Sequence, residues 1–425
     1  MHILLVHQAF TALDEPGGTR HHELARYLAG RGHSVTIIAS PVSYLTGSPS
    51  PFGRGVRGEG AGGEGDIKVI RSYTYRALHK SFVHRAFSFI SFMVSSFFAG
   101  LRVKQVDLVW GTSPPIFQGV TAWMLARLKG VPFLFEVRDL WPTFAIAVGV
   151  LKNPLLIGMS LWLERFLYRH ADRIMVNSPG YVAYVTERGG RQVKLVPNGA
   201  DPDMFDPAGQ GADFRSANHL EDKFVILYAG AHGMSNDLGV VLDAAKILDD
   251  LTVTLPPTPI DGGKRGGSKV TVIFLFLGDG KEKPALQKQA AAMKLDNVLF
   301  LPPVAKTSMS AALAGADAGL AILKPIAEYK TTYPNKVFDY MAAGKPVILA
   351  IDGVIREVVE AAGCGIFAQP GDPAALAQAV QSLAADRVRS RQMGMNGRKY
   401  LEEHFDRSAL AARLVDIMEN MLTRN

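Results

Sequence analysis

A lysine and an aspartate three positions apart form the part of the sequence best suited to chemistry. They are Lys336 and Asp339, in the stretch KTTYPNKVFDYMAAGKPV that runs from 330 to 347. Side chains three apart share one side of a helix, and the N–H groups of a first helical turn attract anions. A cation, a carboxylate and a helix N-terminus together can hold a diphosphate and a ribose. The simpler alternative is a solvated Lys–Asp pair on an ordinary surface helix.

The neighbouring residues predict the helix that would position this pair. Pro334 suits the first helical turn, where its missing N–H would be unpaired anyway. Gly344 suits a left-handed cap at the end of the helix, and Pro346 prevents its continuation. An apolar face at helical spacing is predicted to be buried, and it consists of Val337, Phe338, Met341 and Ala342.

Composition limits the classes of protein to consider. The 425 residues suffice for two domains, and 48% apolar and 20% charged residues are typical of a globular protein. A net charge of +7 favours phosphate-bearing ligands or an anionic membrane surface. Nucleic acid is not expected, because no basic run has interleaved aromatic residues. The single cysteine, Cys364, excludes an internal disulfide and is compatible with a reducing cytoplasm. We expect no signal peptide, because no basic segment precedes the first apolar run.

The N-terminal segment predicts a βαβ unit with a glycine pair in its first loop. Strands are expected at 3–6 and 34–39, with a helix at 20–30. Gly17 and Gly18 precede that helix, where they allow close approach of a ligand and present N–H groups to an anion. Glycines in such a turn also occur for steric reasons alone.

The segment 84–104 is unusually apolar and is flanked by basic residues. As a helix, 86–101 would be about 24 Å long at ~1.5 Å per residue, shorter than a hydrocarbon core of ~30 Å. Basic residues at both ends suit a helix lying in the interface of an anionic membrane. The alternative is a helix buried between the layers of a domain.

Further along, Arg138 and Asp139 follow a predicted strand at 132–137. Open α/β sheets bind ligands at this edge, so both are site candidates, although a structural ion pair is the alternative. A turn is predicted at 111–115. An amphipathic helix is predicted at 154–170, with Trp162, Phe166 and Leu167 facing inward.

The strand–helix alternation then restarts, which predicts two α/β domains. Each would be a Rossmann-like, doubly wound domain, and the two would face a cleft. We expect the domains at 1–205 and 206–405, with a polar linker at 201–221 and the final helix, 408–425, packed back on the first domain. Exposed loops are predicted at 46–66 and 256–269.

Six short motifs carry a resemblance to a known family. They are the glycines at 17–18, FEVRDLWP at 135–142, VPNG at 196–199, YAG at 228–230, LGDG at 277–280 and PNKVFDYMAAGKP at 334–346. With these motifs the chain resembles the family 4 glycosyltransferases, which are retaining enzymes of the GT-B class with nucleotide-sugar donors. It looks most like bacterial members that build O-antigen, capsule or exopolysaccharide from N-acetylated or deoxy sugars on lipid-linked acceptors.

The resemblance implies roles for individual residues. Lys336, Arg138 and Asp139 would be catalytic, and His21 and His22 would lie on the acceptor side, although a histidine pair at a helix start is more often surface filling. The implied donor-binding residues are Gly17, Gly18, Asp339, Asn335, Lys330, Gly278 and Val304.

The chain also departs from the family pattern. The first of two glutamates usual for the family falls on Thr331, whereas Asp339 matches the second, which would bind the ribose. The arginine and lysine usual at the diphosphate fall on Ala231 and Asn236, so we expect Lys336 and Lys330 to replace them.

The sequence therefore predicts transfer of a sugar from a nucleotide-sugar, which we expect to be UDP-linked, to a lipid-linked or saccharide acceptor. We expect no cofactor and no metal, a cytoplasmic location, and peripheral membrane contact through 84–104. Two alternatives remain open. One is a nucleotide-sugar epimerase of the same architecture, and the other is a non-catalytic, membrane-associated partner of a polysaccharide complex.

Overall fold

The chain divides into two compact units. The computed structural model describes residues 1–43, 66–76, 82–207, 209, 211–250, 253–254 and 269–423. One unit comprises Met1–Pro197 with Arg407–Asn425, and the other comprises Asn198–Asp406. The division thus lies at 197/198, where the sequence suggested 205/206. The loops predicted at 46–66 and 256–269 lie outside the described residues, apart from Asp66 and Lys269.

The first unit is built on a parallel sheet with the strand order β3-β2-β1-β4-β5-β6-β7. In the register of β1 and β4, the last residue of β1, Val6, lies opposite Gly111, and β4 continues two residues further to Ser113. The strands are β1 (His2–Val6), β2 (Ser34–Ala39), β3 (Ile67–Arg71), β4 (Leu108–Ser113), β5 (Phe133–Val137), β6 (Arg173–Val176) and β7 (Val193–Leu195).

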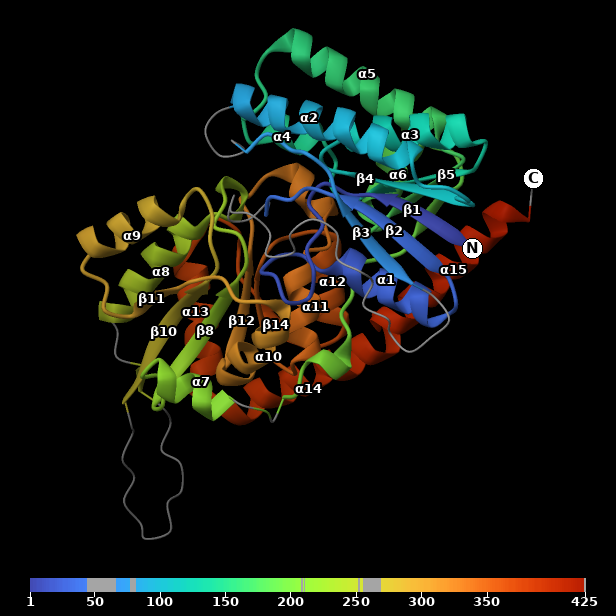
Figure 1. The fold of residues 1–425 in the computed structure, drawn as a ribbon. Coiled ribbons are helices and arrows are strands. Elements are labelled where there is room, and N and C mark those ends of the chain that lie inside the picture. The colour runs from blue at the N-terminus through green and yellow to red at the C-terminus, as the bar shows by residue number, and fades with distance from the viewer. Residues whose placement is uncertain are drawn as a thin grey trace. The chain divides into compact units, whose positions relative to one another are not determined.

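Helices cover both faces of this sheet (Figure 1). The core on one face includes residues of α1 (Arg20–Gly30) and α15 (Arg407–Leu422). The core on the other face includes residues of α2 (Phe82–Leu101), α3 (Phe117–Lys129), α5 (Pro154–His170) and α6 (Gly180–Glu187). A short helix, α4 (Thr143–Ala147), follows β5. None of the helices in the described ranges is both long and apolar enough to cross a bilayer.

The second unit repeats the same design with its own sheet. Its strand order is β11-β10-β8-β12-β13-β14, all parallel along this path, and β9 pairs antiparallel with β10. The strands are β8 (Lys223–Ala229), β9 (Val253–Thr254), β10 (Lys269–Leu277), β11 (Val298–Leu301), β12 (Ala318–Ile322), β13 (Val347–Ala350) and β14 (Gly365–Phe367).

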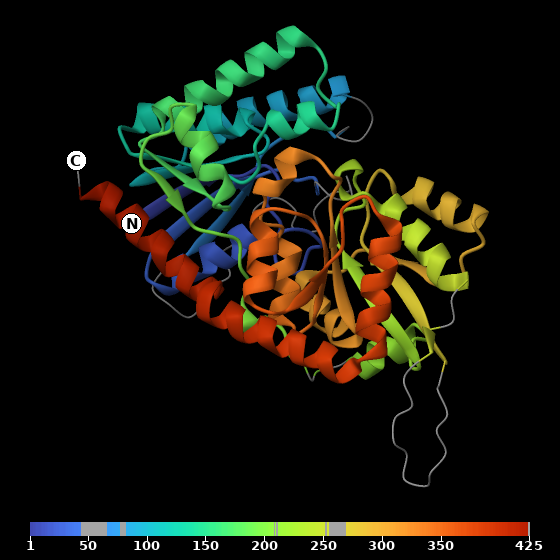
Figure 2. The ribbon, with the colours of Figure 1, turned by 180° about the vertical axis from the view of Figure 1, so that it is seen from behind.

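Two layers of helices enclose this second sheet (Figure 2). One core includes residues of α8 (Leu238–Asp250), α9 (Lys283–Ala292) and α13 (Pro373–Ala385). The other core includes residues of α7 (Gly211–Ala217), α10 (Lys306–Gly315), α11 (Asn335–Ala342), α12 (Val354–Ala361) and α14 (Arg387–His404). Three 3-10 turns complete the unit: η1 (Pro202–Met204), η2 (Met234–Asn236) and η3 (Ala327–Thr331). The predicted fold class, two doubly wound α/β domains, is confirmed.

Two local predictions are wrong because tertiary packing extends the elements. The turn predicted at 111–115 is in part strand, since Gly111 to Ser113 pair with β5 and complete β4. The segment predicted as a linker at 201–221 contains η1 and α7. Phe205 and Leu220 in this segment are each 2% exposed and belong to a core of the second unit.

The predicted inward position of Trp162 is also wrong. Leu167 is fully buried, but Trp162 is 64% exposed. The two residues are five positions apart, which is about 140° around a helix of ~3.6 residues per turn. The buried side of α5 instead contains Glu164 and Tyr168 beside Leu167.

Candidate active site

Strand order indicates where each unit can bind a ligand. In the first sheet the chain turns from one side to the other between β1 and β4, and in the second between β8 and β12. Open α/β sheets bind ligands at the carboxyl ends of strands beside such a switch point. The residues that follow these strands are therefore the candidates for ligand contact in each unit.

In the second unit, Lys336 lies beside this switch point. Its Nζ atom is 3.6 Å from the ring centre of Tyr228 in β8. A Cβ atom added to Gly230, just after β8, would lie 3.4 Å from the same Nζ. Burial lowers the pKa of Lys336 to about 7, and no carboxylate among the described residues forms an ion pair with it. A desolvated ammonium of this kind gains from binding an anion, because the anion favours its charged form.

Two glycine loops pack against each other next to Lys336. A Cβ on Gly278 would collide with the carbonyl oxygen of Gly230, and one on Gly280 would collide with that of His232. Their φ angles of +156° and +155° also favour glycine. Lys283 Nζ donates hydrogen bonds to the carbonyl oxygens of Gly278 at 2.7 Å and Leu301 at 2.9 Å. The backbone at this edge therefore carries no side chain at Gly278 and Gly280, and the hydrogen bonds from Lys283 hold it in place.

Asp339 lies on the same helix as Lys336 but has a different partner. Lys306 Nζ, at the start of α10, donates to Asp339 Oδ1 at 2.6 Å. The two side chains are only 8% and 16% exposed. Because α10 begins at Lys306, it brings a cation to Asp339. The solvated Lys336–Asp339 pair considered above is not what the structure contains.

The other predicted donor-side residues surround α11. Asn335 is its first residue, with Pro334 as N-cap, and Gly344 has the predicted left-handed conformation at φ +63°. The predicted apolar face is confirmed, because its four residues are completely buried. Lys330 forms an ion pair with Asp352 at 2.8 Å. Val304, in the loop that follows β11, is partly buried and packs against the core of the second unit.

In the first unit, a histidine that the sequence reading missed follows β1. His7 Nδ1 lies 3.0 Å from Thr112 Oγ1 at the end of β4. Gln118 Nε2 donates to the same oxygen at 2.8 Å, and its Oε1 accepts from the Gln8 N–H at 2.6 Å. Burial, followed by the charges of His21 and Arg138, lowers the pKa of His7 well below its usual value. The buried His7 ring thus lies at the switch point between β1 and β4.

A buried carboxylate organises the start of α1. Glu136, in β5, lies 2.6 Å from His21 Nε2 and 3.1 Å from Arg20 Nε. Burial alone raises the pKa of Glu136, but His21 and Arg20 outweigh it and hold the pKa at about 2. Arg20 also donates to the carbonyl oxygens of Pro197 and Val196, both at 2.9 Å. His21 lies against His7, with ring centres 4.2 Å apart.

The predicted acceptor-side histidines and loop glycines lie at the start of α1 and in the loop before it. His21 and His22 are 1% and 8% exposed, so the alternative that they fill the surface is wrong. His22 Nδ1 accepts from the Leu13 N–H at 2.9 Å and fixes the loop before α1. Gly17 has φ +147°, and a Cβ there would press on Thr11, whereas one on Gly18 would meet open space.

Arg138 and Asp139 follow β5, as the sequence predicted. Arg138 Nη2 donates to the Pro114 carbonyl oxygen at 2.8 Å, which ties this loop to the end of β4. Burial raises the pKa of Asp139 to about 6, although Arg138 opposes the rise. Asp139 can therefore exchange a proton close to neutral pH.

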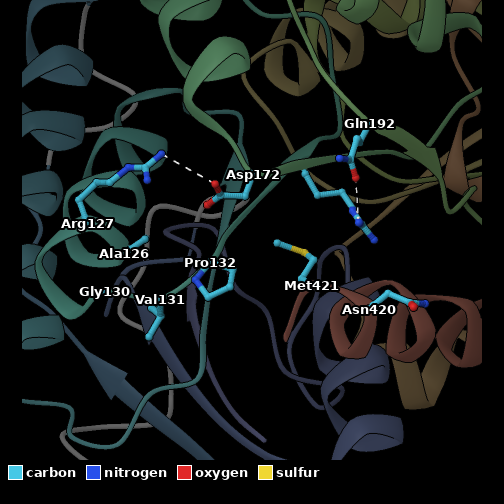
Figure 3. Close-up of a pocket in the computed structure, with 10 residues that line it drawn as sticks. Ala126, Arg127, Gly130, Val131, Pro132, Asp172, Gln192, Asn420 and Met421 are labelled. Carbon is cyan, nitrogen blue, oxygen red and sulfur yellow. Dashed lines mark hydrogen bonds and ion pairs between the residues drawn. The ribbon is translucent and has the colours of Figure 1, made fainter. Parts of the chain in front are cut away.

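One cavity of the first unit lies at the opposite edge of its sheet (Figure 3). Its volume is about 370 Å³, and Pro132 and Arg173 place it where β5 and β6 begin. Since ligands of open α/β sheets bind at the other edge, we do not include this cavity in the site. Among the described residues, no group of three or more His, Cys, Asp and Glu side chains could hold a metal ion.

Family models match both units. Residues 17–199 match the model described as glycosyl transferase 4-like domain. Residues 224–386 match the model described as glycosyl transferases group 1. The chain belongs to the glycosyltransferases, with a domain of the 4-like family followed by a domain of group 1.

Two relatives of this chain are themselves named as glycosyltransferases. One, from Escherichia coli, is named as a colanic acid biosynthesis glycosyl transferase, WcaI, and is 24% identical over 78% of each chain. Another, from Pseudomonas aeruginosa, is named as the glycosyltransferase WbjE, and is 24% identical over 66% of this chain and 67% of its own.

Solved structures share the fold of the glycosyltransferase. Sucrose-phosphate synthase from Thermosynechococcus elongatus has a TM-score of 0.76 at 18% identity, with both chains fully covered. Anabaena HepE, solved in complex with UDP and glucose, has a TM-score of 0.70 at 16% identity and covers 99% of this chain and all of its own. At these identities the likeness concerns the fold.

Several residues of the glycosyltransferase site were missed by the sequence reading. A signal existed for Glu136, because a carboxylate within an otherwise apolar buried strand requires a partner. Tyr228 lies within a motif that was recognised, but its contact with Lys336 joins positions far apart in the sequence. Nothing in the spacing of Lys306 indicated that it pairs with Asp339.

Proposed function

We propose that this glycosyltransferase moves a sugar, of the N-acetylated or deoxy hexose class, from a UDP-linked donor to a lipid-linked or saccharide acceptor with retention of configuration. The product would enter a cell-surface polysaccharide. The names of WcaI and WbjE and the UDP in the HepE complex support this choice of reaction and donor.

The observation that carries the proposal is the position of Lys336. A cation with a pKa of about 7 lies at the switch point of the second sheet, beside Gly230. In the proposed reaction the bond between the anomeric carbon and the diphosphate oxygen breaks, and negative charge develops on the leaving diphosphate. Lys336 would neutralise this charge as it forms, which is where an electrostatic group contributes most to rate.

The remaining steps follow from the same bond changes. The acceptor hydroxyl forms the new bond to the anomeric carbon, and its proton passes to an oxygen of the departing diphosphate. Arg138, through its fork of N–H donors, would bind an acceptor phosphate or the leaving group. Asp339 would bind the ribose, with Lys306 fixing its carboxylate, and the backbone of 278–280 and 302–304 would bind the base.

Membrane contact through α2 forms part of the proposal. The outward residues of this helix are apolar, and they are Phe87, Ile90, Val94, Phe98 and Leu101, each more than 40% exposed. The buried side contains Ser88, Ser96 and Gly100, and a Cβ on Gly100 would collide with Leu125 of α3. Phe92 is also fully buried on that side and anchors the helix in the core. A helix anchored in this way, with large apolar residues outside, suits a lipid interface better than water.

The experiment has two stages. Screening UDP-, GDP- and dTDP-sugars for thermal stabilisation identifies the donor, because a ligand that binds only the native state raises the melting temperature. Turnover of that donor is then compared between the natural protein and Lys336→Ala. We expect a loss on the order of 10²–10³ in kcat. A change below about threefold would remove Lys336 from the mechanism, and conversion of donor without acceptor would indicate an epimerase.

A further inference from the structure

The outer face of α5 is apolar and aromatic although it is exposed. Leu155, Met159 and Trp162 are 70%, 58% and 64% exposed. They are spaced four and three positions apart and therefore lie on one side of the helix. Arg165 and Arg169 continue the same side toward the C-terminal end, and both are exposed. The three apolar side chains are thus exposed at one end of the face and the two arginines follow at the other, with the stem of Arg169 lying against Gly189.

A groove of about 340 Å³ follows the arginine end of this face. Three aromatic rings stack along it: the ring centres of Trp162 and Phe166 are 5.5 Å apart, and those of Phe166 and His170 are 4.1 Å apart. The groove is lined by Gly158, Leu161, Trp162, Arg165, Phe166, Arg169 and His170.

The two guanidinium groups are available to an anion. Within the described part of the chain, neither Arg165 nor Arg169 forms an ion pair or a hydrogen bond through its side chain. The nearest carboxylate in sequence, Glu164, points the other way, is fully buried and accepts from the hydroxyl groups of Tyr168 and Tyr184. Two arginines without ion-pair partners can bind the phosphate group of a lipid, and the aromatic rings beside them can contact its acyl chains.

Charge distribution favours an anionic partner over a second copy of this chain. Residues 82–170 contain nine Lys and Arg but four Asp and Glu. Two of those four acids, Glu136 and Glu164, are fully buried. Two copies meeting through this face would bring like charges together, whereas an anionic bilayer would neutralise them. Both α2 and α5 lie on the same side of the first sheet, so both can face one surface (Figures 1 and 2).

We infer that α5 is a docking site for an anionic phospholipid bilayer. Leu155, Met159 and Trp162 enter the interface, and Arg165 and Arg169 bind lipid phosphates in the groove. The site extends the membrane contact proposed for α2, and it is independent of the donor chemistry.

Binding of the full chain to vesicles tests the inference. Flotation compares phosphatidylcholine vesicles with and without phosphatidylglycerol, for the natural protein and for the double variant Arg165→Gln/Arg169→Gln. Each basic residue near an anionic surface contributes about 1 kcal/mol, so we expect roughly 10- to 30-fold weaker binding to the vesicles that contain phosphatidylglycerol. Binding of the natural protein should also weaken with added salt. A second variant, Trp162→Ser, should weaken binding to both kinds of vesicle.

Matched controls exist on α14 of the second unit. Arg389 and Arg391 are exposed, and Val388 is 79% exposed. Arg389→Gln/Arg391→Gln removes the same charge, and Val388→Ser removes an exposed apolar side chain, so both should bind vesicles like the natural protein. Donor-induced thermal stabilisation should be unchanged in the α5 variants, which shows that they fold.

Three results would overturn the inference. The first is α5 variants that bind vesicles as the natural protein does. The second is control variants that lose as much affinity as the α5 variants. The third is a concentration-dependent dimer that only the α5 variants abolish. If Phe98→Ser in α2 weakens binding while the α5 variants do not, the membrane contact proposed for α2 survives and the α5 site does not.

Discussion

Lys336 and Tyr228 form a cation–π contact, with 3.6 Å between the ammonium nitrogen and the ring centre, although 108 positions separate them (336 − 228). The contact holds the lysine at the switch point of the second sheet, where no carboxylate among the described residues forms an ion pair with it. A structural lysine would gain from a carboxylate partner, whereas an anion-binding lysine must keep its charge available.

Replacing Lys336 by Met should separate function from stability. The variant keeps an apolar stem over Tyr228 and removes a desolvated ammonium, so the ligand-free protein should unfold at the same temperature or a slightly higher one. Stabilisation by the donor should be lost. Differential scanning fluorimetry with and without UDP measures both effects, and Lys288→Met, at an exposed position of α9, is the control. A large drop in the melting temperature of the ligand-free variant would indicate a structural role instead.

Replacing Glu136 by Gln should destabilise the first unit. The change leaves Arg20 buried without its counter-charge, which costs about 3 kcal/mol. Urea unfolding at neutral pH measures the loss, with the exposed Glu187→Gln as control. Since the pKa of Glu136 is lowered to about 2, its contribution is present above its usual pKa and is lost as the pH falls toward 2. An unchanged free energy of unfolding at neutral pH would contradict this role.

Replacing Asp139 by Asn should stabilise the protein in a pH-dependent manner. Its pKa is raised to about 6, so the folded state binds more protons than the unfolded state between about 4 and 6. Ionisation of Asp139 therefore lowers stability above pH 6, and the variant should gain on the order of 1 kcal/mol at pH 8. The gain should shrink as the pH falls to 5. Melting temperatures across this range test it against the exposed Asp416→Asn, and a gain that grows on acidification would refute the sign.

Replacing Tyr340 by Phe should loosen α11. The Tyr340 hydroxyl donates to the Leu320 carbonyl oxygen and accepts from the Ala229 N–H, both at 3.1 Å, and so joins the helix to β8 and β12. Losing both bonds in a buried site should cost about 1–3 kcal/mol. Chemical unfolding measures the cost, and Tyr73→Phe, at a side chain that is 67% exposed, should be neutral. Equal behaviour of the two variants would show that this hydroxyl does not hold the helix.

Periodicity predicted the elements well because it reflects local geometry. The bounds of α1 and α5 agree with the prediction, as do the buried face of α11 and the left-handed Gly344. The segment 86–101, considered as a helix, is helical within α2. These features depend on residues a few positions apart, so one sequence contains what is needed to infer them.

Long-range pairing could not be predicted in the same way. Asp339 forms an ion pair with Lys306, which lies outside the motif that contains Asp339 and Lys336. Glu136 contacts Arg20 and His21, which are 116 and 115 positions away in the sequence. Such contacts depend on which strands become neighbours, and residue spacing does not determine that. The direction of Trp162 was missed for a related reason, because an aromatic residue on an amphipathic helix is normally assigned to the core.

Calorimetric titration of UDP at pH 8 into the natural protein and Lys336→Met tests the central claim most directly. A lysine with a pKa of about 7 is mostly neutral at this pH, and a bound diphosphate would restore its charge. Titrations in buffers of different ionisation enthalpy should therefore show uptake of most of one proton by the natural protein. The variant should bind roughly 100-fold more weakly, with no uptake. Equal affinity and equal proton uptake in both proteins would contradict the claim that Lys336 binds the diphosphate.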